Sequence, residues 1–270
     1  MPTADLLVSD ALSIADEVDA LTIAGSQGHI AIDLKPDDTP VTAIDRAAEQ
    51  LVRERLASAR PGDTIVGEEF GVTAGTDGAP ARGRRWVVDP IDGTKNFVRG
   101  VPAWATLIGL LEGDDAVVGV VSAPALGRRW YASRGGGAWA VTRLSGLPTQ
   151  PQRLAVSAVA DLADASVSYS SLTGWEEHGL LEPFLELTRA TRRTRAFGDF
   201  WSYMMVAEGL VDVACEPELA LHDMVALVPI VVEAGGRFTS LAGVPGPFGG
   251  NAIATNGALH DAAIALLVKT

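Results

Sequence analysis

The chain begins with apolar and polar residues arranged at helical spacing. In residues 4–24, apolar side chains recur three or four positions apart, which places them on one face of a helix. These side chains are Leu7, Ala11, Ile14, Val18 and Leu21. A second helix is predicted over residues 42–56, with Thr42 as its N-terminal cap and Asp45 in its first turn. We therefore expect two amphipathic helices at the start of the fold.

The next part of the chain changes to short runs of β-branched and aromatic residues, which favour strands. The predicted strands cover residues 65–67, 86–88, 106–111, 117–122 and 129–132, the last four in an antiparallel sheet. Three consecutive glycines at 135–137 then indicate a turn. Residues 71–84 are rich in glycine, alanine and threonine and contain Pro80, so a loop is predicted there.

A proline-containing segment at 147–151 is the best candidate for a boundary, because strands and helices alternate after it. The predicted strands are 166–170, 194–197, 211–215 and 252–255, and the predicted helices are 180–188, 198–208, 224–234 and 260–268. This alternation favours an α/β arrangement. We therefore predict an α+β half at 1–147 and an α/β half at 148–270.

Composition and charge narrow the possible functions. The 270 residues are 47% hydrophobic and carry 34 acidic against 21 basic side chains, a net charge of −13. Nucleic-acid binding needs a basic surface, so it is disfavoured. The single cysteine, Cys215, has apolar neighbours and is expected in the core, and no internal disulfide can form. There is no signal-peptide pattern and no apolar run near the roughly 20 residues of a membrane helix, so a cytoplasmic protein without a membrane partner is expected.

The candidate chemistry lies in the segment Trp86-Val87-Val88-Asp89-Pro90-Ile91-Asp92-Gly93-Thr94. A strand leads into Asp89, Pro90 is predicted to end it, and Asp92 follows on a tight turn. Buried carboxylates are costly unless a positive group neutralises them, and Mg²⁺ prefers oxygen ligands of this kind. Glu68 and Asp223 complete a set of four acids. Together they suggest a site for several metal ions that acts on phosphate esters.

Several motifs together resemble the inositol monophosphatase family. They are Pro40–Asp45, Gly67-Glu68-Glu69, Asp89–Thr94, and Asp223 followed by Glu233-Ala234-Gly235-Gly236. Members of this family are metal-dependent, lithium-sensitive phosphatases. The resemblance implies a layered αβαβα sandwich of the inositol monophosphatase and fructose-1,6-bisphosphatase type, with the site in a cleft between the two halves. It also implies a homodimer.

Two further segments, Thr94–Trp104 and Ala196–Phe200, resemble the actinobacterial histidinol-phosphate phosphatase branch of the family. The implied reaction is Mg²⁺-dependent hydrolysis of L-histidinol phosphate to L-histidinol and phosphate. The alternative is an inositol-1-monophosphatase or another sugar-phosphate phosphatase. A third hypothesis is an interaction protein without catalysis, but a full set of ligands with Thr94 and Asp45 speaks against it.

The resemblance also implies a role for each matching residue. Glu68, Asp89 and the Ile91 carbonyl would hold one Mg²⁺, while Asp89, Asp92 and Asp223 would hold a second. Glu68 would help to hold a third, weaker ion through water, and Mn²⁺ could replace Mg²⁺. Thr94 and Asp45 would orient and deprotonate the attacking water. Backbone N–H groups of Gly93, Thr94 and Lys95 would cradle phosphate, and Lys35 matches a lysine near the waters of the third ion.

Gly198, Asp199 and Glu216 fall where the family recognises the leaving alcohol, and Asp92 belongs to the same substrate-binding set. Histidinol can be cationic, so two extra acids facing it make physical sense. The chain departs from the family pattern at His222, where a tryptophan is usual. There a histidine could be a ligand, a donor to a ligand or a packing residue, and the last two are favoured. Pro229 is predicted to kink the helix at 224–234.

Overall fold

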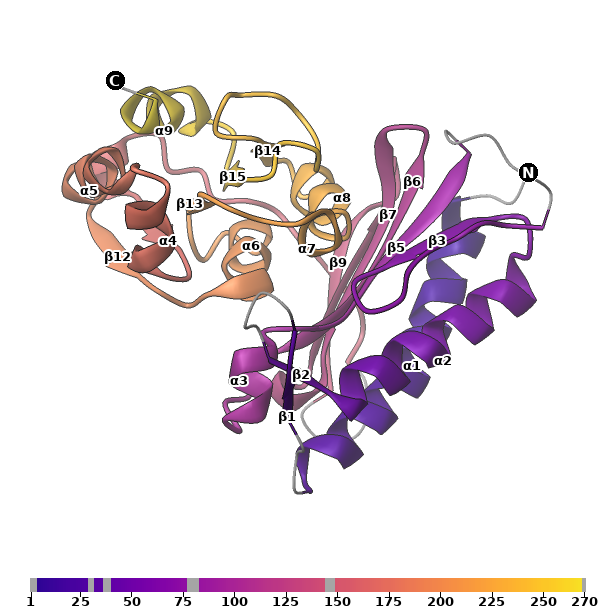
Figure 1. The fold of residues 1–270 in the computed structure, drawn as a ribbon. Helices are drawn as coiled ribbons and strands as arrows, with labels where there is room; N and C mark the ends of the chain where they lie inside the picture. Colours follow the sequence, from indigo (N-terminus) through magenta and orange to yellow (C-terminus); the bar gives the residue numbers. More distant parts are fainter. Residues whose placement is uncertain (1–3, 29–31, 36–39, 77–82, 144–148, 269–270) are drawn as a thin grey trace.

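The computed structural model describes residues 4–28, 32–35, 40–76, 83–143 and 149–268 (Figure 1). Its helices are α1 (Ala4–Ser26), α2 (Ala43–Ala59), α3 (Thr94–Val98), α4 (Leu172–Glu177), α5 (Leu181–Ala190), α6 (Asp199–Ala207), α7 (Leu221–Met224), α8 (Leu227–Glu233) and α9 (His260–Leu267). Short 3₁₀ turns cover Pro124–Leu126 and Leu162–Asp164. The predicted helices at both ends of the chain are confirmed, whereas sequence reasoning missed α4.

The strands form three sheets. A small pair joins β1 (Ile32–Leu34) to β2 (Pro40–Thr42). The large sheet contains β3 (Thr64–Gly67), β4 (Gly71–Thr73), β5 (Arg84–Asp92), β6 (Ala105–Glu112), β7 (Asp115–Ala123), β8 (Arg128–Ser133), β9 (Gly137–Thr142) and β10 (Gln152–Arg153). The third contains β11 (Ser166–Ser168), β12 (Arg193–Arg195), β13 (Val213–Glu216), β14 (Arg237–Thr239) and β15 (Ala252–Thr255). The predicted antiparallel sheet is confirmed.

The large sheet has the order β10-β9-β8-β7-β6-β5-β3-β4, and only the β3–β5 pair in it is parallel among the described strands. Helices α1 and α2 cover one face of this sheet (Figure 1). Leu7, Ile14 and Val18 of α1 pack there with Trp86 and Ile108 of the sheet. The predicted helical periodicity therefore identified the buried face of α1 correctly.

The opposite face of the large sheet packs on α6 and α8, which separate it from the third sheet (Figure 1). The third sheet has the order β12-β11-β13-β15-β14 and mixes parallel with antiparallel pairs. Its outer face packs against α4, α5 and α9 around Trp175 and Phe184. Helix, sheet, helix, sheet and helix layers follow one another, which confirms the predicted αβαβα sandwich.

Two local expectations were wrong, and a third was met. Pro90 does not end its strand, because β5 continues to Asp92. The register with β6 is irregular between Asp89 and Asp92, and this bulge accommodates the N–H that Pro90 lacks. Part of the predicted loop at 71–84 is strand β4, which pairs with β3, and residues 77–82 of that loop lie outside the described residues. The helix predicted at 224–234 is interrupted, as expected from Pro229: it is divided into α7 and α8 one turn before the proline, while Val225 and Ala226 keep helical dihedral angles.

That break sits against a pair of glycines in the large sheet. Gly109 of β6 and Gly119 of β7 are directly opposite each other, and both face the break. A Cβ at Gly109 would lie 2.6 Å from Val225 Cγ1, and one at Gly119 would overlap the Ala226 carbonyl oxygen. Pro229 has no N–H to bond the Val225 carbonyl, which favours ending α7 there. The glycine pair thus provides the space that brings α7 against the sheet.

Two buried side chains belong to the third sheet and the helix after it. Cys215 is fully buried in the core of the third sheet, as expected. His260, at the start of α9, is also buried, with its ring nitrogens 3.0 Å from Thr239 Oγ1 and Thr255 Oγ1. Within the described residues, no helix is both long and apolar enough to span a bilayer. The predicted boundary at 147/148 falls in undescribed residues, so the division into halves stays a prediction.

Candidate active site

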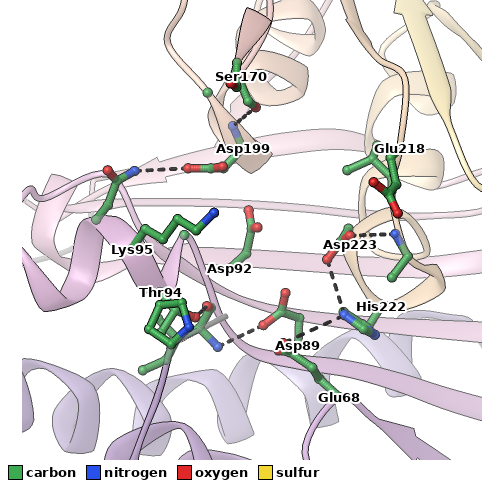
Figure 2. A pocket seen from close by; sticks show the side chains of 18 of the residues that line it. Glu68, Asp89, Asp92, Thr94, Lys95, Ser170, Asp199, Glu218, His222 and Asp223 are labelled. Atoms are coloured by element: carbon green, nitrogen blue, oxygen red, sulfur yellow. Dashed lines mark hydrogen bonds and ion pairs between the residues drawn. The ribbon is translucent and has the colours of Figure 1, made fainter. Parts of the chain in front are cut away.

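A cleft of about 840 Å³ brings together the predicted acidic residues from both parts of the chain (Figure 2). One wall comes from the ends of β3 and β5 and from α3. The other comes from the start of α6, from α7 and from the loop before it. Lining residues include Glu68, Asp89, Asp92, Asp199 and Asp223. Gly109 and Gly119 leave the space in which α7 packs against the sheet, so the position of Asp223 depends on that packing.

Asp89, Asp92 and Asp223 form a compact group in which one carboxylate oxygen of each lies within 4.8 Å of the others. Backbone N–H groups hold these side chains in place. Ile91 donates to Asp89 Oδ1 at 3.0 Å and Phe200 donates to Asp92 Oδ2 at 2.7 Å. Ala220 donates to Asp223 Oδ2 at 2.7 Å. The structure therefore brings together the three acids that were predicted to share the second metal ion.

The electrostatics of this group call for a cation. Burial is the main cause that raises the pKa of Asp89, Asp92 and Asp223 above the ordinary aspartate value, and repulsion from neighbouring carboxylates adds to it. Three acids held this close by fixed N–H donors cannot all ionise without a compensating positive charge. The oxygen-only donor set fits a hard divalent cation such as Mg²⁺. The residues present therefore fit the metal that the motifs implied.

A second group joins Glu68, Asp89 and His222, whose ligand atoms also lie within 4.8 Å of one another. His222 Nε2 lies 3.5 Å from Asp223 Oδ1 and 4.0 Å from Glu68 Oε1, so it faces the acids (Figure 2). Simple packing therefore does not describe His222. Lys35 Nζ reaches Glu68 Oε1 at 2.5 Å and Glu69 Oε1 at 2.6 Å. Lys35 thus supplies one positive charge on the Glu68 side of the cleft.

Thr94 and Asp45 meet at the edge of the carboxylate group. Thr94 Oγ1 lies 3.3 Å from Asp45 Oδ1 and 2.9 Å from the Ile91 carbonyl oxygen, and can donate to either. The other oxygen of Asp45 accepts from the Thr42 N–H at 2.8 Å and its hydroxyl at 2.6 Å, which completes a capping box at the start of α2. Burial raises the pKa of Asp45, although the hydrogen bonds from Thr42 oppose that shift.

The backbone that the resemblance assigns to phosphate lies where β5 turns into α3. Gly93 caps α3 with a left-handed φ of 83°, a conformation that glycine adopts at no steric cost. A Cβ there would lie 2.9 Å from the Ala103 carbonyl oxygen and 3.3 Å from Asp199 Oδ2. Thr94 and Lys95 follow as the first residues of the helix, where N–H groups have no acceptor within the helix. All three residues line the cleft.

Asp199 lies on the opposite side of the cleft, at the start of α6, where Gly198 also lines it. It is the only described non-glycine residue with positive φ, at 48°. Its N–H donates to Ser170 Oγ at 2.8 Å, and its Oδ2 accepts from Asn96 Nδ2 at 3.0 Å (Figure 2). Burial raises the pKa of Asp199 to about 6; Asp223 adds to the increase and Lys95 opposes it.

Glu216 is absent from the described residues that line the cleft. It ends β13 as a largely buried side chain, and its Oε1 has no hydrogen-bond partner among the described residues. Burial raises the pKa of Glu216 to about 8; a hydrogen bond with Ser170 lowers it, and Asp199 and Asp223 add repulsion. Direct recognition of substrate by Glu216 stays a prediction.

Sequence reasoning missed several residues of the cleft. Asn96 and Ser170 hold Asp199, and Glu218 and Phe197 line the same side. Asn96 lies inside the resembling segment Thr94–Trp104, so its position was a signal that could have been used. Ser170 and Glu218 lie in no motif. They reach the site only because segments that are distant in the sequence pack together.

Known proteins resemble this chain over most of its length. A model of the inositol monophosphatase family matches residues 10–270. The histidinol-phosphatase of Streptomyces coelicolor is 58% identical over 253 residues, which cover 92% of this chain and 91% of that protein. The histidinol-phosphatase of Mycobacterium tuberculosis is 56% identical over 252 residues, which cover 93% of this chain and 94% of that protein.

The fold has close relatives among solved structures as well. The crystal structure of the extragenic suppressor protein SuhB from Bartonella henselae matches with a TM-score of 0.85 at 27% identity, over 98% of this chain and 99% of that one. The family model and the fold thus both extend over nearly the whole chain. The chain therefore belongs to the inositol monophosphatase family.

Proposed function

We propose that this protein is a Mg²⁺-dependent phosphomonoesterase that hydrolyses L-histidinol phosphate to L-histidinol and phosphate. The observation that carries the substrate assignment is Asp199, a largely buried acid that faces the carboxylate group from the leaving-group side of the cleft. A cationic alcohol would offset its charge, whereas a neutral polyol would not. The high identity to two histidinol-phosphatases over most of the chain supports the same substrate.

The carboxylates of the cleft would hold the metal ions. Glu68, Asp89 and the Ile91 carbonyl would hold one ion, and Asp89, Asp92 and Asp223 would hold a second. Glu68 would also help to hold a third through water. Bound Mg²⁺ would polarise the phosphoryl group and lower the pKa of the attacking water. Replacement by Mn²⁺ and inhibition by Li⁺ are part of the same proposal.

The chain's own groups position the water and receive its proton. The Thr94 hydroxyl can accept a hydrogen bond from water while donating to Asp45 Oδ1. Asp45 then takes the proton through Thr94, and its raised pKa makes it a better base than an exposed aspartate. The water oxygen bonds to phosphorus as the bond to the alcohol oxygen breaks, and the alcohol oxygen takes up a proton from solvent, which balances the proton received by Asp45. N–H groups of Gly93, Thr94 and Lys95 hold the phosphate oxygens during this exchange.

Substrate selection falls to the α6 side of the cleft. Asp199 and Gly198 lie where the leaving alcohol departs, and we assign Glu216 a supporting charge behind them. The acidic net charge supports a small-molecule substrate rather than a nucleic acid. Action in the cytoplasm stays a prediction.

The decisive experiment measures phosphate release from L-histidinol phosphate and myo-inositol 1-phosphate, with and without Mg²⁺, for the wild type and Asp199→Asn. Asparagine is preferred to alanine because it tolerates a φ of 48° and can keep the contact with Asn96. A charge-assisted hydrogen bond is worth about 1.5–3 kcal/mol. We therefore expect kcat/KM on histidinol phosphate to fall by about one to two orders of magnitude.

Hydrolysis of inositol phosphate by Asp199→Asn should change little, because the carboxylate group and Thr94 remain. Equal losses on both substrates would mean that Asp199 supports the structure of the site. A wild type that prefers inositol phosphate would replace the histidinol assignment with the alternative, inositol-1-monophosphatase.

A further inference from the structure

Glu49 is a fully buried carboxylate on α2 that no part of the proposed mechanism uses. Its Oε2 accepts from the Glu69 N–H at 2.6 Å, and its Oε1 accepts from the Phe70 N–H at 3.1 Å. These two N–H groups belong to the turn that directly follows β3 and begins with Glu68. A helix side chain therefore holds the backbone on which a proposed metal ligand sits.

Gly67 makes this contact sterically possible. A Cβ built on Gly67 would overlap the Glu49 carboxylate, closer than real Cβ atoms approach other atoms. The φ of Gly67 lies outside the left-handed region, so its backbone would accept other residues. The glycine of Gly67-Glu68-Glu69 is thus required by the approach of Glu49 rather than by the turn itself.

Arg53 extends the same contact to the next strand. One turn further along α2, its Nε donates to Glu49 Oε1 at 2.7 Å and neutralises the buried charge. Its other nitrogens donate to the Gly71 carbonyl at 2.5 Å and to Thr73 Oγ1 at 2.8 Å, both on β4. Glu49 and Arg53 together fix the whole β3–β4 hairpin against α2. The Glu68 backbone is also held from β5, because the Glu68 N–H donates to the Val88 carbonyl at 3.2 Å.

We infer that Glu49 is a positioning residue for the metal site, acting on Glu68 through the backbone of the turn. The inference rests on the proposed function, since it concerns the ion that Glu68 would bind. Without Glu49, Glu69 and Phe70 lose their acceptor, the turn relaxes, and the Glu68 carboxylate no longer stays directed at Asp89. Metal affinity then falls, while the groups that carry out the chemistry remain in place.

Glu49→Gln tests this role with almost no change of shape. In the same position a glutamine places an NH₂ group where one carboxylate oxygen was, so one of the two backbone N–H groups would face a donor and lose its acceptor. Loss of an outer contact to a metal ligand typically weakens metal binding about 10- to 100-fold. We expect a loss of this size in Mn²⁺ affinity, measured by electron paramagnetic resonance of free Mn²⁺. The value of kcat at saturating metal should stay near that of the wild type.

Gly67→Ala is a second test that does not remove Glu49. The added methyl should displace the Glu49 carboxylate and weaken Mn²⁺ binding in the same way. In a Glu49→Ala background the methyl has room, so adding Gly67→Ala should then cause no further loss of affinity. A further loss in that background would show that Gly67 acts independently of Glu49 and would overturn the steric part of the inference.

Asp212→Asn is the matched control, because Asp212 is also a buried carboxylate that accepts a backbone N–H, from Ser166 at 2.6 Å. Asp212 directly precedes β13 of the third sheet, away from the Glu68 turn, so its variant should lower thermal stability without changing Mn²⁺ affinity. Wild-type affinity in folded Glu49→Gln, or an equal loss in Asp212→Asn, would overturn the positioning role. A wild type that binds no Mn²⁺ would instead overturn the proposed metal site itself.

Discussion

Asp45 serves two purposes at once because its two carboxylate oxygens face different partners. Oδ2 completes the capping box with Thr42, and Oδ1 faces the Thr94 hydroxyl. The capping box fixes the side chain at the start of α2, so Oδ1 is already directed at Thr94 before substrate arrives. A motif that indicates a helix start in the sequence thus also orients the proposed base.

Thr94→Ala tests the water-orienting role at the residue scale. Loss of the hydroxyl breaks the proton path to Asp45, and general base catalysis typically contributes about 10²- to 10⁴-fold. We expect kcat to fall by that factor while Mn²⁺ affinity is retained, since the carboxylates are untouched. Thr94→Ser keeps the hydroxyl and should retain most activity. If Thr94→Ala lost metal binding instead, the hydroxyl would matter for holding the Ile91 carbonyl.

At the scale of elements, the site depends on how α7 meets the large sheet. Asp223 lies on α7, and the chain directly after it packs on Gly109 and Gly119. Neither glycine has positive φ, so the absence of a side chain, rather than backbone freedom, explains them. Small residues in the middle of two strands weaken a sheet locally, but here they admit a helix terminus.

Gly119→Ala should therefore affect both stability and the metal site. The added methyl would overlap the Ala226 carbonyl oxygen, and overpacking of a core typically costs about 1–3 kcal/mol. Displacement of the break should also move Asp223 and weaken Mn²⁺ binding. Gly28→Ala is the control, because its Cβ would lie 3.8 Å from the nearest neighbour, the Gly25 carbonyl oxygen. Urea denaturation and Mn²⁺ titration measure the two effects, and unchanged values for Gly119→Ala would contradict this account.

His260 couples the start of α9 to pH. Burial lowers its pKa from 6.5 to about 4, with Arg237 adding to the decrease and Asp261 opposing it, so the folded protein holds the neutral ring. The folded state therefore binds fewer protons than the unfolded state between these two values. The stability that the neutral His260 ring gives to the folded state is complete above pH 6.5 and is lost as the pH falls through about 4.

We predict that the lowered pKa of His260 removes about 3 kcal/mol of unfolding free energy between pH 7 and pH 4. His260→Gln cannot titrate, so its unfolding free energy should fall less steeply over this range than that of the wild type. Comparing the two proteins cancels the contributions of other acids. Parallel curves of unfolding free energy against pH would show that His260 has the same pKa in the folded and unfolded protein, which would contradict the lowered pKa.

At the scale of the whole molecule, the concentrated negative charge of the cleft should make stability depend on metal. Binding to the folded state alone adds about 2.7 kcal/mol when the metal concentration is 100 times Kd. We expect Mg²⁺ to raise Tm and EDTA to remove the increase, with NaCl at equal ionic strength as the control for screening of the net charge of −13. Identical melting curves in Mg²⁺ and NaCl would argue against a buried ion.

The homodimer is a second prediction at this scale and rests on the family resemblance alone. Light scattering at micromolar concentration should give twice the 28.1 kDa of one chain. A mass near that of one chain would contradict it.

The sequence by itself determined the donors of the candidate site and the layers of the fold. Glu68, Asp89 and Asp92 were identified because carboxylates that follow apolar strands need a cation, whereas the role of Asp223 and the layered fold followed from motifs that resemble the family. The helices were identified because apolar spacing reports which face is buried. Both signals are local in the chain, so they can be read without coordinates.

Only the tertiary structure decided how these pieces meet. Glu49 was part of an ordinary helix in the sequence, and its contact with the turn after β3 exists only because α2 packs on the sheet. Ser170 contacts Asp199, and His260 is buried, because segments that are separated in the sequence pack together. The break before Pro229 was set by the glycine pair opposite it as well as by the proline. Contacts between distant segments depend on the shapes of both partners, and a local pattern reports only one of them.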